Sequence, residues 1–212
     1  MKMKYKDVPV FIIHLPMSVE REPYIEKLKT QFTNVRIIEA IHWGDIENPE
    51  YYLDMKNFIR MPTLKPRNLL ARVACFLSHR KALQTISYEM EHNGLENAII
   101  LEDDAIVVDE SLLEKEVSDD DIVVLGYKTI TKNNKKIGTW SIYYKNGFLV
   151  DGILASMCQF KWKAFDLWLY KNVCPYVKTS YLSCIEDGSS CQNIVPSYLT
   201  TGMKNKYHKD FH

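Results

Sequence analysis

The chain has 212 residues, of which 46% are hydrophobic and 25% charged, and its 27 basic and 27 acidic side chains give a formal net charge of zero. This length suffices for a substantial core in one large domain or two small ones. A neutral chain lacks the overall basic field of general nucleic-acid binders, so we expect no nucleic-acid partner.

The location of the protein is predicted from segments that the chain lacks. No stretch approaches the ~20 apolar residues of a transmembrane helix, and residues 1–8 lack the apolar run of a secretory signal. The five cysteines are scattered and form no Cys-x-x-Cys pair, which disfavours a structural zinc site. We therefore expect a cytoplasmic protein with reduced thiols.

Three clusters of lysine leave weak association with a membrane surface open as an alternative. They are ordinary solvated charge, or they attract the protein weakly and peripherally to anionic lipid or to an anionic acceptor. The clusters are Lys2, Lys4 and Lys6; Lys132, Lys135 and Lys136; and Lys204, Lys206 and Lys209.

The first elements follow a strand, helix, strand pattern. Residues 8–13 form an apolar run typical of a strand, and Ser18 is positioned to cap the helix that follows. Arg21 is expected about one turn into this helix, and residues 35–40 read as the second strand. Residues 46–66 carry three prolines and little periodicity, which predicts a long loop.

The middle of the chain alternates helix and buried strand. Apolar residues recur at helical spacing from residue 67 until Gly94 ends the helix. A buried strand at residues 98–101 follows, then a short helix at 112–117 and another buried strand at 122–126.

The last third is predicted from turn signals. An Asn-Gly dipeptide at 146–147 favours a hairpin between residues 140–144 and 147–150. Residues 152–158 are consistent with one more strand, and 163–173 with a helix. The alternation of buried strands and helices predicts an α/β fold with a mostly parallel central sheet.

Three consecutive carboxylates, Glu102, Asp103 and Asp104, end the strand at residues 98–101; we call them the acidic triplet. Open α/β sheets bind their ligands at the carboxyl ends of the strands, which is where these side chains lie. Adjacent carboxylates repel one another unless a cation lies among them. In an extended segment Glu102 and Asp104 point the same way, which offers two oxygens to Mg²⁺ or Mn²⁺. The alternatives are a solvated acidic loop, or Asp104 capping the next helix.

Several segments, in this order, resemble glycosyltransferase family 25, the lipopolysaccharide and collagen β-galactosyltransferase group. The resemblance spans residues 8–126, and two departures stand out: His14 replaces the family's usual Asn, and Ala74 its usual Gly. The matching segments are residues 10–16, 39–41, 74–79, 99–104 and 121–126.

The resemblance implies a GT-A-like, Rossmann-like fold in a single domain over residues 1–212. Residues 8–126 would be the nucleotide-sugar and metal-binding half, and residues 127–212 the acceptor-side half. It further implies a metal-dependent, inverting transfer of a hexose, with galactose favoured, from a UDP-sugar to a hydroxyl of a glycan or protein, as in lipopolysaccharide biosynthesis.

The candidate metal ligands are Glu102 and Asp104, which would hold Mn²⁺ or Mg²⁺ against the diphosphate of the donor. Two candidates for donor binding have an alternative role: Arg21 as an ordinary surface arginine, and His79 as a hydrogen-bonded structural histidine. The candidate donor-binding residues are His14, Arg21, Ser78, His79 and Asp103.

Inversion needs a general base that deprotonates the attacking hydroxyl, as in inverting glycosidases. The candidates are Asp151, Glu186 and Asp187; we choose Asp187 because it lies in a late, acceptor-side segment, although each is alternatively a solvated loop acid.

Two rival functions stay open. One is a degenerate relative that binds nucleotide-sugar or glycan without catalysis, and the other is a metal-dependent phosphohydrolase, which would need a second cluster of metal ligands.

Overall fold

The computed structural model describes residues 2–47, 66–126, 128–130, 135–137, 140–159, 165–182 and 185–187. Its centre is a six-stranded sheet in which β1 pairs in parallel with β2 and β3, and β5 in parallel with β9, while β8 runs antiparallel to β3 and β5. This mixed α/β architecture with a mostly parallel sheet confirms the predicted fold class. The strands in spatial order are β2 (Val35–Glu39), β1 (Val10–His14), β3 (Ala98–Glu102), β8 (Ser141–Tyr144), β5 (Ile122–Val124) and β9 (Thr179–Tyr181).

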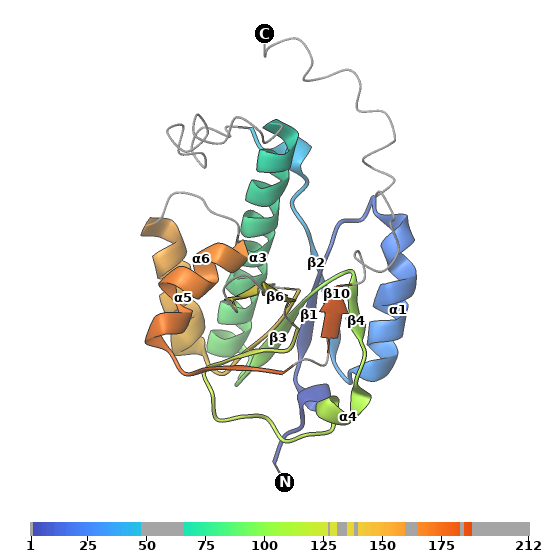
Figure 1. Ribbon diagram of the computed structural model, residues 1–212, viewed down its shortest axis with the longest axis vertical. Helices are drawn as coiled ribbons and strands as arrows, with labels where there is room; N and C mark the ends of the chain where they lie inside the picture. Colours follow the sequence, from blue (N-terminus) through green and yellow to red (C-terminus); the bar gives the residue numbers. More distant parts are fainter. Residues whose placement is uncertain are drawn as a thin grey trace.

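Three helices cover one face of the sheet: α3 (Pro66–His92), α5 (Gly147–Gln159) and α6 (Phe165–Asn172) (Figure 1). Alternate residues of β1 and β3, such as Phe11 and Ile100, point into this layer. Apolar residues of all three helices complete one core cluster with them, among them Leu83, Ile86, Val150, Ile153, Trp168 and Leu169.

The opposite face is covered by helix α1 (Glu22–Gln31) and by shorter elements. Ile12 and Ile99, on the other side of β1 and β3, pack there against Ile25 and Leu28 of α1. Burial on both faces explains why the sequences of β1 and β3 are continuous apolar runs. The shorter elements are the 3-10 turn η1 (Tyr5–Asp7), helix α4 (Glu110–Leu113), and strands β4 (Ala105–Val107) and β10 (Ile185–Asp187).

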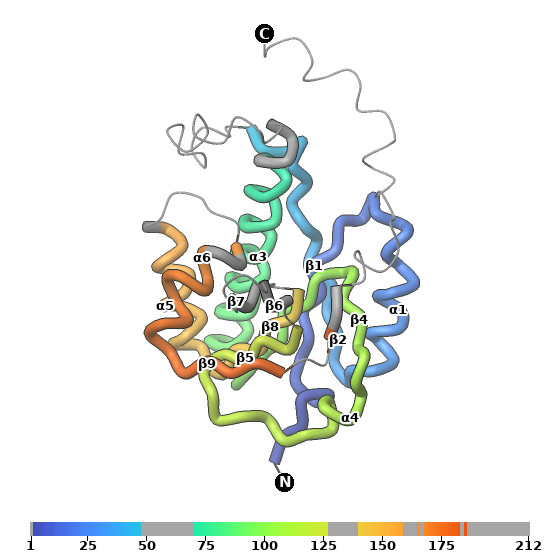
Figure 2. Tube along the Cα trace, viewed as in Figure 1, coloured from blue at the N-terminus to red at the C-terminus, as the bar shows by residue number. Residues whose placement is uncertain are grey.

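β4 and β10 form a separate antiparallel pair, and Figure 2 shows β4 passing between β1 and α1. β9 and β10 lie in a region where the sequence pattern predicts no strand. The remaining described elements are η2 (Val19–Arg21), η3 (Trp43–Asp45), β6 (Lys128–Ile130), β7 (Lys135–Ile137) and η5 (Cys174–Tyr176).

The predicted hairpin after residue 144 and the predicted strand at residues 152–158 are both wrong, because residues 147–159 form helix α5. The backbone N–H of Leu149 donates to Oδ1 of Asn146 at 2.9 Å, so this asparagine caps a helix instead of forming a hairpin turn. Val150, Ile153 and Met157, which are all buried, follow helical spacing and outweigh the turn signal.

Two helix starts also differ from prediction. Helix α4 covers Glu110–Leu113 rather than 112–117, because Oδ1 of Asp109 accepts a bond from the backbone N–H of Ser111 at 3.0 Å. The side chain of Ser18 makes no capping bond, and α1 begins at Glu22 after the short turn η2. Arg21 therefore stands at the start of α1 and not one turn inside it. Most of the predicted loop at 46–66 lies outside the described residues.

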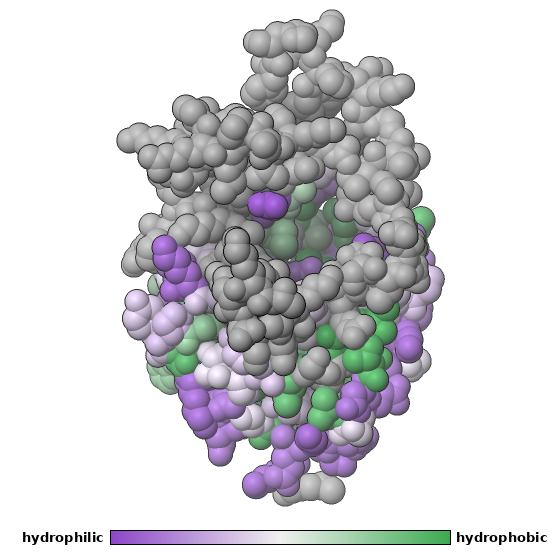
Figure 3. Space-filling model, in the orientation of Figure 1, coloured by the Kyte–Doolittle hydropathy of each residue, from purple (hydrophilic) through white to green (hydrophobic). Residues whose placement is uncertain are grey.

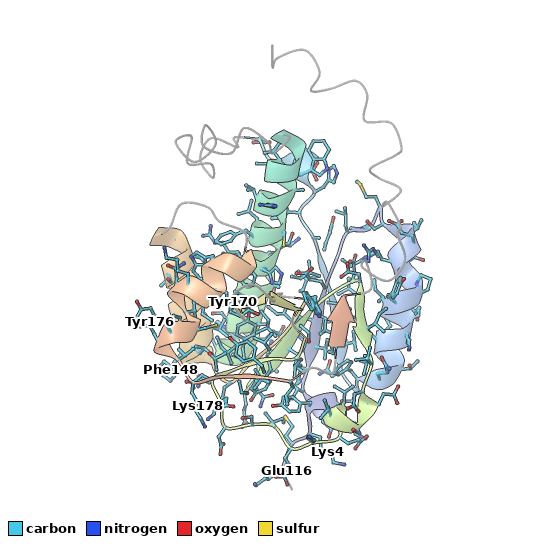
Figure 4. All side chains as sticks on the ribbon, in the orientation of Figure 1. Lys4, Glu116, Phe148, Tyr170, Tyr176 and Lys178 are labelled. Carbon is cyan, nitrogen blue, oxygen red and sulfur yellow. The ribbon has the colours of Figure 1, made fainter. Side chains whose placement is uncertain are left out.

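Two exposed aromatic side chains lie away from the carboxyl edge of the sheet. Phe148 and Tyr176 are strongly exposed on the outer side of the α5–α6 layer (Figure 4). At the other end, an isolated bridge joins Lys4 to Glu116. Within the part of the chain that the structure describes, no helix is both long and apolar enough to span a bilayer.

Candidate functional site

A cavity of about 360 Å³ opens at the carboxyl ends of β1 and β3. Its walls come from the end of β1, the start of α1, residues 40–43 after β2, helix α3 and the acidic triplet. Figure 3 shows a hollow in this face, with both apolar and polar side chains inside it. Parallel strands end together at such an edge, which is the usual ligand site of open α/β sheets.

The acidic triplet forms one wall of the cavity. Residues 103–104 make a turn directly after β3, so the alternation expected of an extended segment does not hold. Glu102, Asp103 and Asp104 all line the cavity, and each lies beside a basic side chain from another element.

Asp104 pairs with Arg21. Nη1 of Arg21 lies 3.0 Å from Oδ2 of Asp104, and only 12% and 13% of the two side chains are exposed. Arg21 reaches the triplet because it stands at the start of α1, beside the end of β1. A pair shielded from water in this way interacts more strongly than an exposed surface pair.

Glu102 pairs with His79. Nε2 of His79 lies 3.0 Å from Oε1 of Glu102. The His79 ring is buried and stacks on Phe165, with ring centroids 4.0 Å apart and planes inclined by 16°. The imidazole is therefore fixed in orientation by α6 while its edge faces the triplet.

Asp103 pairs with His14, the last residue of β1. Nδ1 of His14 lies 2.8 Å from Oδ2 of Asp103, and an ionised carboxylate only accepts, so the ring nitrogen donates. Burial raises the pKa of Asp103 above its ordinary value, while the hydrogen bond from His14 and the charge of Arg21 act in the opposite direction.

Ser78 uses its hydroxyl to join two elements. The hydroxyl donates to the carbonyl of Ala74 at 2.7 Å and accepts from the backbone N–H of Ile41 at 2.8 Å. Ser78 also lines the cavity. Its bonds hold the segment after β2 against α3, which shapes one wall of the site.

Several cavity residues were not selected from the sequence, among them His42, Trp43 and Cys75. His42 and Trp43 follow β2, so they reach the same sheet edge as the triplet, and this position was the available signal. Cys75 lies four residues before His79 on α3, a helical spacing that places both on one side of the helix.

The predicted general base, Asp187, lies in β10, opposite Ala105 in the register of the β4–β10 pair. Ala105 directly follows the triplet, so the backbone of Asp187 is brought next to it; the side chains of Glu186 and Asp187 lie outside the described residues. Asp151 is exposed on α5, accepts a 2.6 Å bond from Oγ of Ser87, and is absent from the described wall of the cavity.

Contacts with the residue after β5 and the residue before β8 fix the position of β10. Nε1 of Trp140 donates to the carbonyl of Ile185 at 3.2 Å, and the N–H of Ile185 donates to the carbonyl of Leu125 at 3.0 Å. These groups pass directly over Gly126, where a Cβ would overlap both the Trp140 ring and the Ile185 carbonyl. Only glycine permits this close approach.

The sequence profile of glycosyltransferase family 25, described as a lipopolysaccharide biosynthesis protein, matches residues 7–165, well over half of the chain. The chain belongs to glycosyltransferase family 25. This membership confirms the family expected from the sequence, and it supports glycosyl transfer between a donor and an acceptor as the activity. A comparison with curated proteins finds no match to this family 25 chain.

Two solved structures are similar to this family 25 chain at low identity. One is a glycosyltransferase involved in the glycosylation of the major capsid of PBCV-1, with 12% identity, a TM-score of 0.48, and coverage of 84% of this chain and 81% of that one. The other is A197 from STIV, with 14% identity, a TM-score of 0.43, and coverage of 84% and 83%. Neither likeness is close enough to inform the site.

The donor atoms at the triplet suit a hard divalent cation. Mg²⁺ and Mn²⁺ prefer carboxylate oxygens and use few protein ligands, completing their shells with water and phosphate. Glu102, Asp103 and Asp104 present carboxylates at one wall of a cavity large enough for phosphate groups beside them. In this family 25 chain the residues present therefore fit a cation-assisted diphosphate site.

Proposed function

We propose that this family 25 glycosyltransferase transfers a hexose from a UDP-sugar to a hydroxyl of a glycan or protein acceptor, with inversion and with Mn²⁺ or Mg²⁺ as cofactor. Galactose is the first sugar to test. The observation that carries the proposal is the acidic triplet, which lines one cavity together with Arg21 and His79, while His14 contacts Asp103 from β1.

Asp104 and Glu102 are the proposed metal ligands, and the cation would act as a Lewis acid on the departing diphosphate. Arg21 supplies a fixed positive charge beside Asp104, where it can meet a phosphate oxygen. His14 holds Asp103 in place by its hydrogen bond, and His79 presents its ring edge to Glu102.

The segment after β2 is the proposed support for the nucleoside. His42 and Trp43 line the cavity and contact each other, with ring centroids 5.1 Å apart and planes inclined by 46°. An aromatic face suits a nucleobase or the apolar face of a sugar. The cavity volume of about 360 Å³ lies within the usual range for small-molecule sites, roughly 300–1,000 Å³.

Asp187 remains the proposed general base. Cα atoms opposite each other in antiparallel strands lie about 4.5–5.5 Å apart, so its register opposite Ala105 supports a position next to the triplet. There a carboxylate would accept the proton of the acceptor hydroxyl while that oxygen attacks the anomeric carbon, and UDP would leave from the opposite side.

The test is a calorimetric titration of UDP into the full chain, first with Mn²⁺ and then with EDTA. Binding that depends on the metal supports the donor site, and absence of binding in both conditions contradicts it. Release of UDP from UDP-galactose and from UDP-glucose, with and without candidate acceptors, then tests transfer and the sugar. Tight UDP binding without any transfer favours the non-catalytic alternative.

A further inference from the structure

A second, chemically different group of ligands adjoins the acidic triplet. Sγ of Cys75, a ring nitrogen of His79 and a carboxylate oxygen of Glu102 all lie within 4.8 Å of one another. We propose that these three residues bind a thiophilic divalent cation, with Zn²⁺ as the ion that fits best. The proposal does not depend on the proposed glycosyl transfer, although the two sites share Glu102 and His79.

The ligand types distinguish this site from the proposed donor-metal site. A thiolate, an imidazole and a carboxylate are the usual ligands of Zn²⁺, whereas Mg²⁺ and Mn²⁺ prefer oxygen alone. Cys75 and His79 are four residues apart on α3, so both reach the same side of the helix. With three protein ligands and a fourth position open to the cavity, the site is of the open kind and not a closed structural one.

The geometry needs only a small adjustment. Bond lengths of about 2.3 Å to sulfur and about 2.0–2.1 Å to nitrogen or oxygen place neighbouring ligand atoms of a tetrahedral site roughly 3.3–3.7 Å apart. The present separations are at most 4.8 Å, so none exceeds the tetrahedral range by more than about 1–1.5 Å. Cys75 is exposed and Glu102 half-buried, while the stacked ring of His79 is the fixed anchor around which the other two ligands would adjust.

A proton now occupies part of the place that the cation would take. Nε2 of His79 and Oε1 of Glu102 are 3.0 Å apart and share a hydrogen bond. The other ring nitrogen, Nδ1, is buried and has no hydrogen-bond partner among the described residues. Since metal ligands must be deprotonated, binding of Zn²⁺ displaces this proton and the Cys75 thiol proton.

Sharing Glu102 has a functional consequence. A Zn²⁺ ion held by Cys75 and His79 draws the Glu102 carboxylate away from a hard cation at Asp104. Where the proposed donor site is correct, Zn²⁺ therefore weakens Mn²⁺-dependent UDP binding, and it does so only while Cys75 is present.

The test measures Zn²⁺ binding by the reduced full chain in competition with a chromophoric chelator, with Co²⁺ as a spectroscopic probe of thiolate ligation. We expect a single tight equivalent and a thiolate-to-cobalt charge-transfer band. Both should be lost in Cys75→Ser, and Zn²⁺ affinity should fall at least tenfold in Glu102→Gln. Calorimetry in buffers of different ionisation enthalpy should show proton release.

The matched control is Cys158→Ser, which removes another exposed cysteine whose Sγ accepts from Arg80 at 3.4 Å. It should bind Zn²⁺ and Co²⁺ as the unmodified protein does. A charge-transfer band that persists in Cys75→Ser, or equal Zn²⁺ affinity of Cys75→Ser and the unmodified chain, overturns the proposal. Because Cys75 is exposed, both variants should fold, which thermal unfolding checks. Failure of UDP binding alone would leave this result unaffected.

Discussion

Nη1 of Arg21 lies 3.0 Å from Oδ2 of Asp104, so the start of α1 is joined to the turn that follows β3. The carboxylate that we propose as a metal ligand is thus already neutralised by an arginine. A cation and Arg21 compete for Asp104, whereas a diphosphate would attract both of them. The pair therefore has opposite effects on metal binding before and after the donor enters.

Replacing Arg21 by Ala should change two affinities in opposite directions. Binding of Mn²⁺ alone should strengthen severalfold, because Asp104 loses its competing partner, and UDP binding in saturating Mn²⁺ should weaken about tenfold, corresponding to about 1.4 kcal/mol. Electron paramagnetic resonance of free Mn²⁺ and calorimetry of UDP measure the two effects. Arg21→Lys keeps the charge but not the planar guanidinium group, so its affinities for Mn²⁺ and UDP should lie between those of Arg21→Ala and the unmodified protein. Two changes of the same sign would contradict the competition.

Replacing Asp104 by Asn should abolish Mn²⁺-dependent UDP binding while the protein stays folded. The variant keeps the shape of the side chain but removes the charge that the cation needs, and leaves Arg21 without its anion. UDP titration with Mn²⁺ measures the loss, and circular dichroism checks the fold. Asp151→Asn, which removes an exposed acid on α5, is the matched control and should bind UDP normally. Tight Mn²⁺-dependent binding in Asp104→Asn would rule out Asp104 as the ligand.

The main strands and α3 could be predicted because burial leaves a local pattern in the sequence. Continuous apolar runs marked β1 and β3, and regular apolar spacing marked α3. Helix α5 was missed because an Asn-Gly dipeptide serves equally as a hairpin turn or as a helix start, and tertiary packing of Val150 and its neighbours decides between them. β9 and β10 are three-residue strands, defined by their partners and not by their own composition.

The site residues also fall into those that a local sequence pattern reveals and those that depend on tertiary structure. The acidic triplet is a local pattern at a strand end, so the sequence was enough to select it. The juxtaposition of Cys75 with Glu102 depends on how α3 crosses the sheet, and no spacing along the chain encodes that. The role of Ser78 was also hidden, because the N–H that it accepts from belongs to Ile41, which lies far away in sequence.

Replacing Ser78 by Ala should destabilise the protein by about 1–3 kcal/mol, because the backbone N–H of Ile41 loses its acceptor in a partly buried position. Chemical denaturation measures this change. Ser87→Ala, on the same helix but with its hydroxyl bound to exposed Asp151, should cost less than about 0.5 kcal/mol. Equal stability of the two variants would show that the Ser78 bonds do not hold the segment after β2.

The stability of the sheet edge should depend on acid through Asp120. Hydrogen bonds from Lys178, Ser180 and Ser118 lower the pKa of Asp120 to about 2. Its unfolded value is about 3.9, so the stabilisation is fully present above pH ~4 and is lost as pH falls toward 2. Asp120→Asn should therefore destabilise the protein by about 1 kcal/mol at pH 7 and by nothing near pH 2. Urea unfolding across this range tests it, with exposed Asp119→Asn as control. A loss that is independent of pH would exclude ionisation as its cause.

Replacing Gly126 by Ala should separate donor binding from transfer. The new Cβ would overlap the Trp140 ring and the Ile185 carbonyl, so β10 must move, and with it the proposed base Asp187. The acidic triplet belongs to the end of β3 and keeps its own contacts, so Mn²⁺-dependent UDP binding should stay within about twofold of the unmodified protein, a difference of about 0.4 kcal/mol. The rate of hexose transfer should fall at least tenfold, about 1.4 kcal/mol in the barrier.

Gly152→Ala is the matched control, since Gly152 lies in α5 and a Cβ at this position would have no heavy atom within 4 Å. There alanine should leave transfer unchanged and raise stability by roughly 0.5–1 kcal/mol, because it favours the helix. Full transfer activity in Gly126→Ala, with the overlap accommodated, would mean that the position of β10 does not control the reaction. In that case Asp187 would lose its place as the proposed base, and the acceptor-side acid would have to be sought elsewhere in the chain.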